Sequence, residues 1–336
     1  MKRNIIFILG LITVIVVGYS CSKIEKGFLS GNVRYVNGTI YVQRGMAYVA
    51  SDRIETDGST PPFSYKLLNL RDKETGQSAP EEFFTEYEVQ MFKSGMVFNA
   101  QTDTTVALLD AKREVVMTPP MVFNEVSGQL VFNRSSSNLP LGSYTFDIEM
   151  TNPKATRLFE NMGEIEVVEP TIDDMFEVNY QAATGSDASE TFYDTPAPQL
   201  SCERVSTDGA RVILKIVDKN GNPFNPANGE VVRRGDRPMF ETYAKFNPVI
   251  ETDTALICDF EVGPFPLANY VDATGYDWLY KMYYRIPNQF AIIDGYQNLN
   301  VNPVFDFRVL MEGTFVVTVR LPSVTRLTTP IGVGGS

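Results

Sequence analysis

The 336-residue chain contains no histidine, and it has only three cysteines and one tryptophan. The absence of histidine excludes Ser-His-Asp and Cys-His nucleophilic catalysis, histidine-ligated zinc and acid–base chemistry by imidazole. A hydrolase would have to use carboxylates or tyrosines alone. The acidic residues lie mostly at turns or alternate outward along expected strands, which is typical of a solvated surface. We therefore predict a non-catalytic protein.

Basic residues are also scarce. Lysine and arginine number 29 against 41 aspartates and glutamates, so the net charge is −12 and the pI is about 4.7. Nucleic acids and anionic surfaces require basic patches, so nucleic acid is not expected as a partner. No phosphate-binding glycine loop or dinucleotide fingerprint is present, so no cofactor is predicted. Two cysteines beyond position 21 without histidine make no zinc site, so no metal is predicted either.

Long apolar runs are absent except near the N-terminus. Ile5 to Val17 follows the cationic Lys2 and Arg3, and this run is shorter than the roughly 20 residues of a membrane-spanning helix. Small residues then precede Cys21. The order resembles a bacterial lipoprotein signal, in which the cysteine is acylated and becomes the mature N-terminus. The alternative is an ordinary cleaved signal followed by a chance cysteine.

Acylation of Cys21 would anchor the chain to a lipid bilayer, because each buried CH₂ contributes about 0.8 kcal/mol. We expect an outer-membrane lipoprotein on the periplasmic or cell-surface face. Residues 1–20 would be the signal peptide and residues 21–28 a tether. The remaining cysteines, Cys202 and Cys258, could form one disulfide in an oxidising compartment or be two buried free thiols in adjacent strands.

The rest of the chain shows the patterns of β-structure. Tyr144, Phe146, Ile148 and Met150 alternate with polar residues, which is the period of a half-buried strand. Asn37-Gly38 stands between two β-rich arms and predicts a hairpin. Turn signals arrive every eight to twelve residues, as a β-sandwich requires. The sequence therefore predicts an all-β fold of two tandem Ig-like β-sandwich domains.

Composition changes at Pro170 to Gln199, where small, polar and proline residues gather. We predict a linker or long loop over 170–199. It would separate an N-terminal domain at 29–169 from a C-terminal domain at 200–330, with a frayed tail at 331–336. A short helix is expected within 78–92. Asp218 to Asn222 is interpreted as a plain turn, because the glycine and glutamate of a calcium loop are missing.

Two stretches resemble a known group of proteins. "DGSTPPFSYKLLNLRDKETGQSAPE" (57–81) and "LPLGSYTFDIEMTN" (139–152), behind a lipoprotein signal, resemble an uncharacterised family of Bacteroidetes lipoproteins. The resemblance implies β-sandwich domains and an association with Sus-type glycan-uptake loci. These motifs are structural turns, so the resemblance implies no catalytic residues.

The run "YDWLYKMYYRIP" (276–287) is the main candidate site. As a strand it would place four rings on one face: Tyr276, Trp278, Tyr280 and Tyr284. Such rings can stack on sugars, with polar contacts from Asp277, Lys281 and Arg285. The alternative is core or edge packing, since Tyr and Trp are ordinary residues of sandwiches.

Two functions follow from these observations. The first is a glycan-binding accessory of a polysaccharide-uptake system, with polysaccharide and other outer-membrane uptake proteins as partners. The second is a structural or adhesive cell-surface protein, a fimbrial or assembly component that uses its β-edges for protein contacts and has no small-molecule ligand. Exposure of Trp278 discriminates between them.

Overall fold

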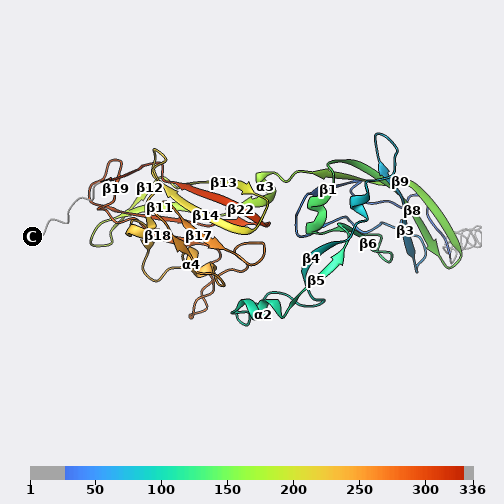
Figure 1. Cartoon of the computed structure of the whole chain (residues 1–336), viewed down its shortest axis with the longest axis horizontal. Helices are drawn as coiled ribbons and strands as arrows, with labels where there is room; N and C mark the ends of the chain where they lie inside the picture. Colours follow the sequence, from blue (N-terminus) through green and yellow to red (C-terminus); the bar gives the residue numbers. More distant parts are fainter. Residues whose placement is uncertain (1–26, 329–336) are drawn as a thin grey trace, which may run out of the picture.

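The computed structural model describes residues 27–328, and within them the chain is built almost entirely from strands. Strands account for 43% of the residues and helices for 8%, so the predicted all-β fold is confirmed. The sheets gather in two groups along the long axis of the molecule (Figure 1). Among the described residues, no helix is both long and apolar enough to span a membrane. The predicted signal peptide, Cys21 and the tail 331–336 lie outside the described residues.

The N-terminal half is organised around a four-stranded sheet in the order β1-β9-β8-β3. Its strands are Thr39–Gln43 (β1), Ala155–Val168 (β9), Gly142–Asn152 (β8) and Ser64–Asp72 (β3). A second sheet consists of Val49–Ala50 (β2), Leu130–Phe132 (β7) and Met121–Phe123 (β6). Two 3₁₀ turns accompany them, Glu81–Phe83 (η1) and Arg134–Asn138 (η2).

The core of this half follows from the alternation along β8. Tyr144, Phe146, Ile148 and Met150 are all buried, as the sequence pattern predicts. They pack in one cluster with Leu130 and Phe132 of β7. Complete burial of such a side chain contributes about 1.5–3 kcal/mol. The alternation along β8 therefore directs the side chains that pack the two sheets together.

The C-terminal half contains two five-stranded sheets. One runs Phe192–Thr195 (β12), Gln181–Ser186 (β11), Asn300–Phe305 (β20), Met282–Arg285 (β18) and Val232–Arg233 (β15). The other runs Gln199–Ser206 (β13), Gly313–Arg320 (β22), Ala210–Val217 (β14), Leu256–Asp259 (β17) and Ile250–Glu251 (β16). One continuous cluster of buried side chains, including Phe305 and Phe315, joins strands of both sheets.

Short elements complete this half. Two strand pairs are Phe176–Glu177 (β10) with Arg308–Val309 (β21), and Ala291–Ile293 (β19) with Val324–Arg326 (β23). The helical turns are Ile172–Met175 (α3), Pro226–Asn228 (η3) and Phe240–Tyr243 (α4).

A hairpin of Tyr87–Phe92 (β4) and Arg113–Thr118 (β5) extends from the N-terminal half and ends in a loop with the helix Val106–Asp110 (α2) (Figure 1). This loop contacts the C-terminal half. Lys245 Nζ donates to the Ala100 carbonyl oxygen at 3.0 Å.

The predicted linker at 170–199 is wrong. These residues form α3, β10, β11 and β12, and β11 pairs antiparallel with β20 over six residues. The small residues are there because the strand is crowded. A Cβ at Gly185 would lie 2.8 Å from Leu299 Cδ1, and Ser186 is fully buried. The domain limits 29–169 and 200–330 stay a prediction, although β11 and β12 belong to the C-terminal sheets.

Two local predictions also fail. Asn37-Gly38 does not close a hairpin, because β1 pairs parallel with β9 and the Asn37 side chain binds Asp52 at 2.6 Å. The helix expected within 78–92 is only the single turn η1, followed by β4. The alternating residues of β4 pair along their whole length with β5. In both places, pairing with distant segments determines the structure.

Candidate ligand-binding site

The aromatic run 276–287 is a turn followed by a strand. Met282–Arg285 forms β18, within a five-stranded sheet. The residues before it form an irregular turn in which Leu279 has φ = 55°. A non-glycine residue in the left-handed region is uncommon and interrupts the alternation of an extended chain. The four predicted rings therefore cannot share one face.

Asp272 organises the turn. Its carboxylate accepts hydrogen bonds from Thr274 N at 2.9 Å, Thr274 Oγ1 at 2.6 Å and Tyr276 N at 3.1 Å. It also accepts one from the indole Nε1 of Trp278 at 2.8 Å. The Thr274 hydroxyl and then the indole donor lower the pKa of Asp272 to about 2. Asp272 therefore stays ionised at neutral pH and fixes the orientation of the tryptophan.

A second set of bonds closes the turn behind the rings. Trp278 N donates to the Tyr270 carbonyl oxygen at 2.9 Å, and Tyr270 N donates to the Leu279 carbonyl oxygen at 3.0 Å. The carboxylate of Asp277 accepts from Leu279 N at 2.8 Å and from Asn269 Nδ2 at 2.6 Å. The strained backbone at Leu279 is thus held from both sides.

Three rings form the cluster that this turn presents. Tyr276 and Trp278 lie 4.9 Å apart between ring centroids with an interplanar angle of 75°. Trp278 and Tyr283 lie 5.4 Å apart at 85°. Both are edge-to-face arrangements, which aromatic pairs favour. Tyr276 is 58% exposed, and Trp278 and Tyr283 are half-buried. We call Tyr276, Trp278 and Tyr283 the aromatic cluster.

Arg237 lies against a ring of the cluster, and Lys281 lies against a tyrosine outside it. Arg237 Cζ is 5.8 Å from the centroid of the Tyr283 ring. Lys281 Nζ is 4.4 Å from the centroid of the Tyr180 ring. These distances are within the range of cation–π contacts. The positive groups are held against rings and can still offer N–H donors to a ligand beside the cluster.

Two predicted members of the platform lie elsewhere. Tyr284 is 1% exposed, and its hydroxyl accepts a hydrogen bond from Phe240 N at 3.0 Å. It belongs to the core, as its inward position on β18 requires, and cannot touch a ligand. Tyr280 lies under the Arg308 guanidinium, 4.8 Å from ring centroid to Cζ. Including these two tyrosines in the platform was wrong.

Of the three polar residues predicted to bind a ligand, two lie in the turn and one lies elsewhere. Asp277 and Lys281 lie in the turn, while Arg285 binds Glu190 at 2.9 Å and Asn302 Oδ1 at 3.0 Å. The Arg285 side chain is thus held by contacts within the protein. Sequence reasoning missed Asp272 and placed Tyr283 on the opposite face. The signal for Asp272 was the stretch "DATG" (272–275), a typical sequence for a turn in which an aspartate side chain binds backbone N–H groups.

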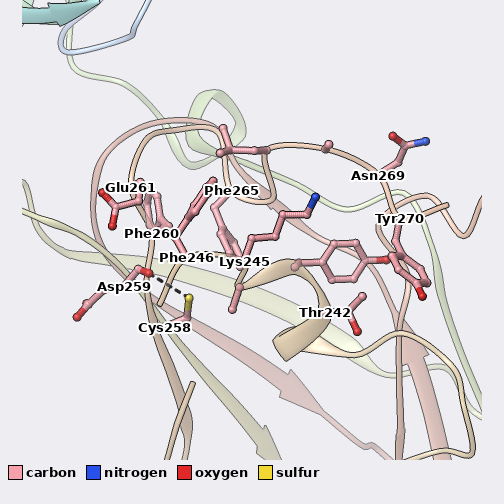
Figure 2. A pocket seen from close by; sticks show the side chains of 14 residues that line it. Thr242, Lys245, Phe246, Cys258, Asp259, Phe260, Glu261, Phe265, Asn269 and Tyr270 are labelled. Carbon is pink, nitrogen blue, oxygen red and sulfur yellow. Dashed lines mark hydrogen bonds between the residues drawn. The ribbon is translucent and has the colours of Figure 1, made fainter. Parts of the chain in front are cut away.

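A small pocket lies behind the turn (Figure 2). Asn269 and Tyr270 line one side of it, and Phe260 and Glu261 the opposite side. Its cavity of about 30 Å³ is comparable to the volume of one water molecule in the liquid, so it cannot admit a sugar ring. Lys245 also lines it, and desolvation lowers the pKa of this lysine. The pocket is a packing gap beside the turn.

Of the two alternatives for Cys202 and Cys258, the disulfide is wrong. Cys202 lies on β13 and Cys258 on β17, and β22 and β14 lie between them in the sheet. Neighbouring strands are about 4.8 Å apart, so the two cysteines are separated by about 14 Å, and a disulfide needs Cα atoms within about 7 Å. Both thiols are free, and burial raises the pKa of each to about 12. They are free thiols, but in strands that are not adjacent.

Asp218 begins the turn after β14. Its carboxylate accepts hydrogen bonds from Asn220 N and Asn222 N, each at 2.9 Å, and from Arg326 N at 3.0 Å. Protein donors thus occupy this side chain, as expected for a plain turn. Within residues 27–328, no group of three or more Cys, Asp or Glu side chains is placed to hold a metal ion.

Comparisons with known proteins add little. No protein-family model matches the chain, and no curated protein matches it. Among solved structures, it is similar to a SusE-like, surface-located polysaccharide-binding protein from the heparin utilisation locus of Bacteroides thetaiotaomicron. The identity is 8% and the TM-score 0.21, over 86% of this chain and 53% of the other, so the chain spans about half of that protein's length. At this TM-score the likeness carries no argument about fold or function.

Proposed function

We propose that this chain is a non-catalytic carbohydrate-binding protein whose ligand stacks on the aromatic cluster. The observation that supports it best is the edge-to-face arrangement of the exposed Tyr276 with the half-buried Trp278 and Tyr283, where Asp272 fixes the orientation of the tryptophan. Apolar faces of sugar rings pack on such side chains, while nearby polar groups bind hydroxyls. Arg237, whose guanidinium lies over the Tyr283 ring, is a polar group beside the cluster, and Lys281 is the second candidate.

The electrostatics of the turn support binding over hydrolysis. A glycosidase needs a carboxyl group that is protonated near neutral pH to act as an acid. Asp272 has the opposite property, because its hydrogen bonds lower its pKa to about 2. Asp277 is occupied by Leu279 N and Asn269 Nδ2. The carboxylates beside the rings therefore serve to build the platform.

The cellular location of the protein is part of the same proposal. The signal-like N-terminus with Cys21 and the resemblance to Bacteroidetes lipoproteins support an outer-membrane lipoprotein on the periplasmic or cell-surface face. Its partners would be the lipid bilayer, a polysaccharide and other outer-membrane proteins of an uptake system.

Retention on a panel of immobilised polysaccharides tests the proposal. We expect wild-type protein to be retained on at least one of them, and Trp278→Ala to weaken binding at least about tenfold, as loss of a central aromatic contact does. Tyr41→Ala, which removes an exposed tyrosine of β1, is the matched control and should bind normally. Because Trp278 is the only tryptophan, its emission should also change when the ligand binds.

Circular dichroism should show that all variants stay folded. A complete lack of retention across neutral and acidic polysaccharides would refute the proposal.

The structural or adhesive alternative is favoured by the β4–β5 hairpin. Its two strands pair only with each other among the described residues, and Val115 and Met117 are 61% and 55% exposed. Exposed apolar strands with open edges are suited to pairing with another protein. This function would be favoured if a membrane protein co-purified with the wild type but not with a Val115→Lys/Met117→Lys variant.

A further inference from the structure

A polar groove lies between the two halves of the chain. It encloses about 640 Å³, within the range of small-molecule sites. Side chains of β4, of η2, of the β13 end and of the segment before β22 form its walls, and they include Tyr87, Glu88, Gln90, Arg134, Arg204 and Glu312. The groove shares no residue with the aromatic cluster.

An ion pair connects its two walls. Arg134 pairs with Glu312, which lies 178 positions away along the chain, and Arg204 Nη2 donates to the Glu312 carbonyl oxygen at 2.9 Å. Arg44 Nη1 lies 2.9 Å from Glu169 Oε1 in the same groove. Of these contacts, the pair of Arg134 with Glu312 joins the two halves, and the other two each fix side chains within one half.

The lining charges almost cancel. Three arginines face four carboxylates, those of Glu88, Glu169, Asp208 and Glu312. Such a mixture selects neither a polyanion nor a polycation. Val89 is the one aliphatic side chain among the described residues that line the groove, so an apolar ligand is not favoured either.

Two polar side chains in the groove, those of Glu88 and Gln90, have no partner in the described part of the chain. They make no side-chain hydrogen bond or ion pair with another described residue, and both are exposed on β4. The Gln90 amide can donate and accept hydrogen bonds and the Glu88 carboxylate can accept them, so both can bind the hydroxyl groups of a ligand. The groove thus offers donors and acceptors together.

We propose that this groove is a second carbohydrate site, which takes a short neutral oligosaccharide. Sugar hydroxyls donate and accept hydrogen bonds, so they match a wall of alternating guanidinium, carboxylate and amide groups. The ligand class rests on the proposed function, but the site is separate. A chain bound here contacts both halves of the protein.

The test measures affinity for neutral hexasaccharides and for polygalacturonate with wild type, Glu88→Ala/Gln90→Ala and Trp278→Ala. We expect the double variant to lose about tenfold in affinity for the neutral ligand, as the loss of two hydrogen-bonding groups predicts. Glu114→Ala on the neighbouring strand β5 is the matched control, because Glu114 is exposed and does not line the groove. The substituted side chains are on the surface, so folding should be unaffected.

Hydrogen exchange provides the second measurement. The neutral hexasaccharide should slow exchange in β4 and in residues 204–208, at both walls of the groove. Unchanged affinity of the Glu88→Ala/Gln90→Ala variant overturns the groove site, and so does absence of this protection. Loss of binding by Trp278→Ala would in that case support the aromatic cluster alone. Binding to polygalacturonate alone overturns the neutral class. Lack of any binding by wild type overturns both proposals.

Discussion

At the scale of single residues, Asp272 has the largest influence on the candidate site. Its hydrogen bonds lower its pKa below that of the unfolded chain, so the charged form is favoured in the folded protein. The stabilisation of the folded state by the ionised Asp272 is therefore complete above the unfolded pKa near 4 and is lost as the pH falls through about 2. The orientation of Trp278 depends on the same carboxylate, because the indole N–H donates to it.

We expect Asp272→Asn to lower the Tm at pH 7, and the difference from wild type to shrink between pH 4 and pH 2 because the wild-type carboxylate becomes protonated. Thermal melts followed by circular dichroism over this range measure it. Asp253→Asn, at an exposed aspartate with no side-chain hydrogen bond in the described part, should leave the Tm unchanged. A difference that stayed constant down to pH 2 would contradict this role of Asp272.

Residue patterns predicted the aromatic run but not its geometry. The composition of 276–287 left core packing and an exposed platform as alternatives, and the structure places Tyr284 in the core and Tyr276 at the surface. The turn depends on the side chain of Asp272 and on the left-handed backbone at Leu279, and neither follows from a period of two. For that reason the assignment failed for Tyr284, which is buried, and for Tyr283, which joins the cluster.

At the scale of elements, β11 shows how composition can mislead. Small, polar residues are typical of loops, but on β11 they allow a strand to approach Leu299 and Ile293 closely. By contrast, β8 was predicted correctly, because its one-sided burial appears directly as alternation. The strand order that separates Cys202 from Cys258 is set by pairing between distant segments, and no local pattern reveals it.

Gly185→Val is expected to destabilise the protein by about 1–3 kcal/mol, because the added atoms would overlap the buried side chains of Leu299 and Ile293. Urea denaturation measures the change. Gly38→Val provides the control, since a Cβ at Gly38 has no neighbour within 4 Å. Equal stability of the two variants would mean that residues 181–186 do not pack as a strand.

At the scale of the whole molecule, the two halves are joined by contacts far apart in sequence. Arg134 pairs with Glu312, and Arg113 Nη1 donates to the Glu261 carbonyl oxygen at 3.1 Å. Phe98 and Phe246 meet edge-to-face at 6.2 Å between centroids. The all-β class was predictable from turn spacing, whereas the groove between the halves was not, since its walls come from six separate segments.

The proposed lipidation of Cys21 would anchor the full-length chain to a membrane. In a bacterial host that processes lipoproteins, the wild type should sediment with membranes, and Cys21→Ser should move it to the soluble fraction because acyl chains can no longer be attached. Cys202→Ala changes a free thiol on β13 and should leave the distribution unchanged. Equal sedimentation of wild type and Cys21→Ser would refute lipidation at this position.

The parallel pairing of β1 with β9 has a mechanical consequence. Thr39 to Gln43 lie beside Glu164 to Val168 in register, with both strands running in the same direction. If the chain is pulled at its two ends, β1 is drawn from its first residue and β9 from its last. The load then acts along the strands, so the hydrogen bonds between them must break together in shear instead of opening one at a time. A surface protein exposed to flow or to a moving polymer would benefit from this arrangement.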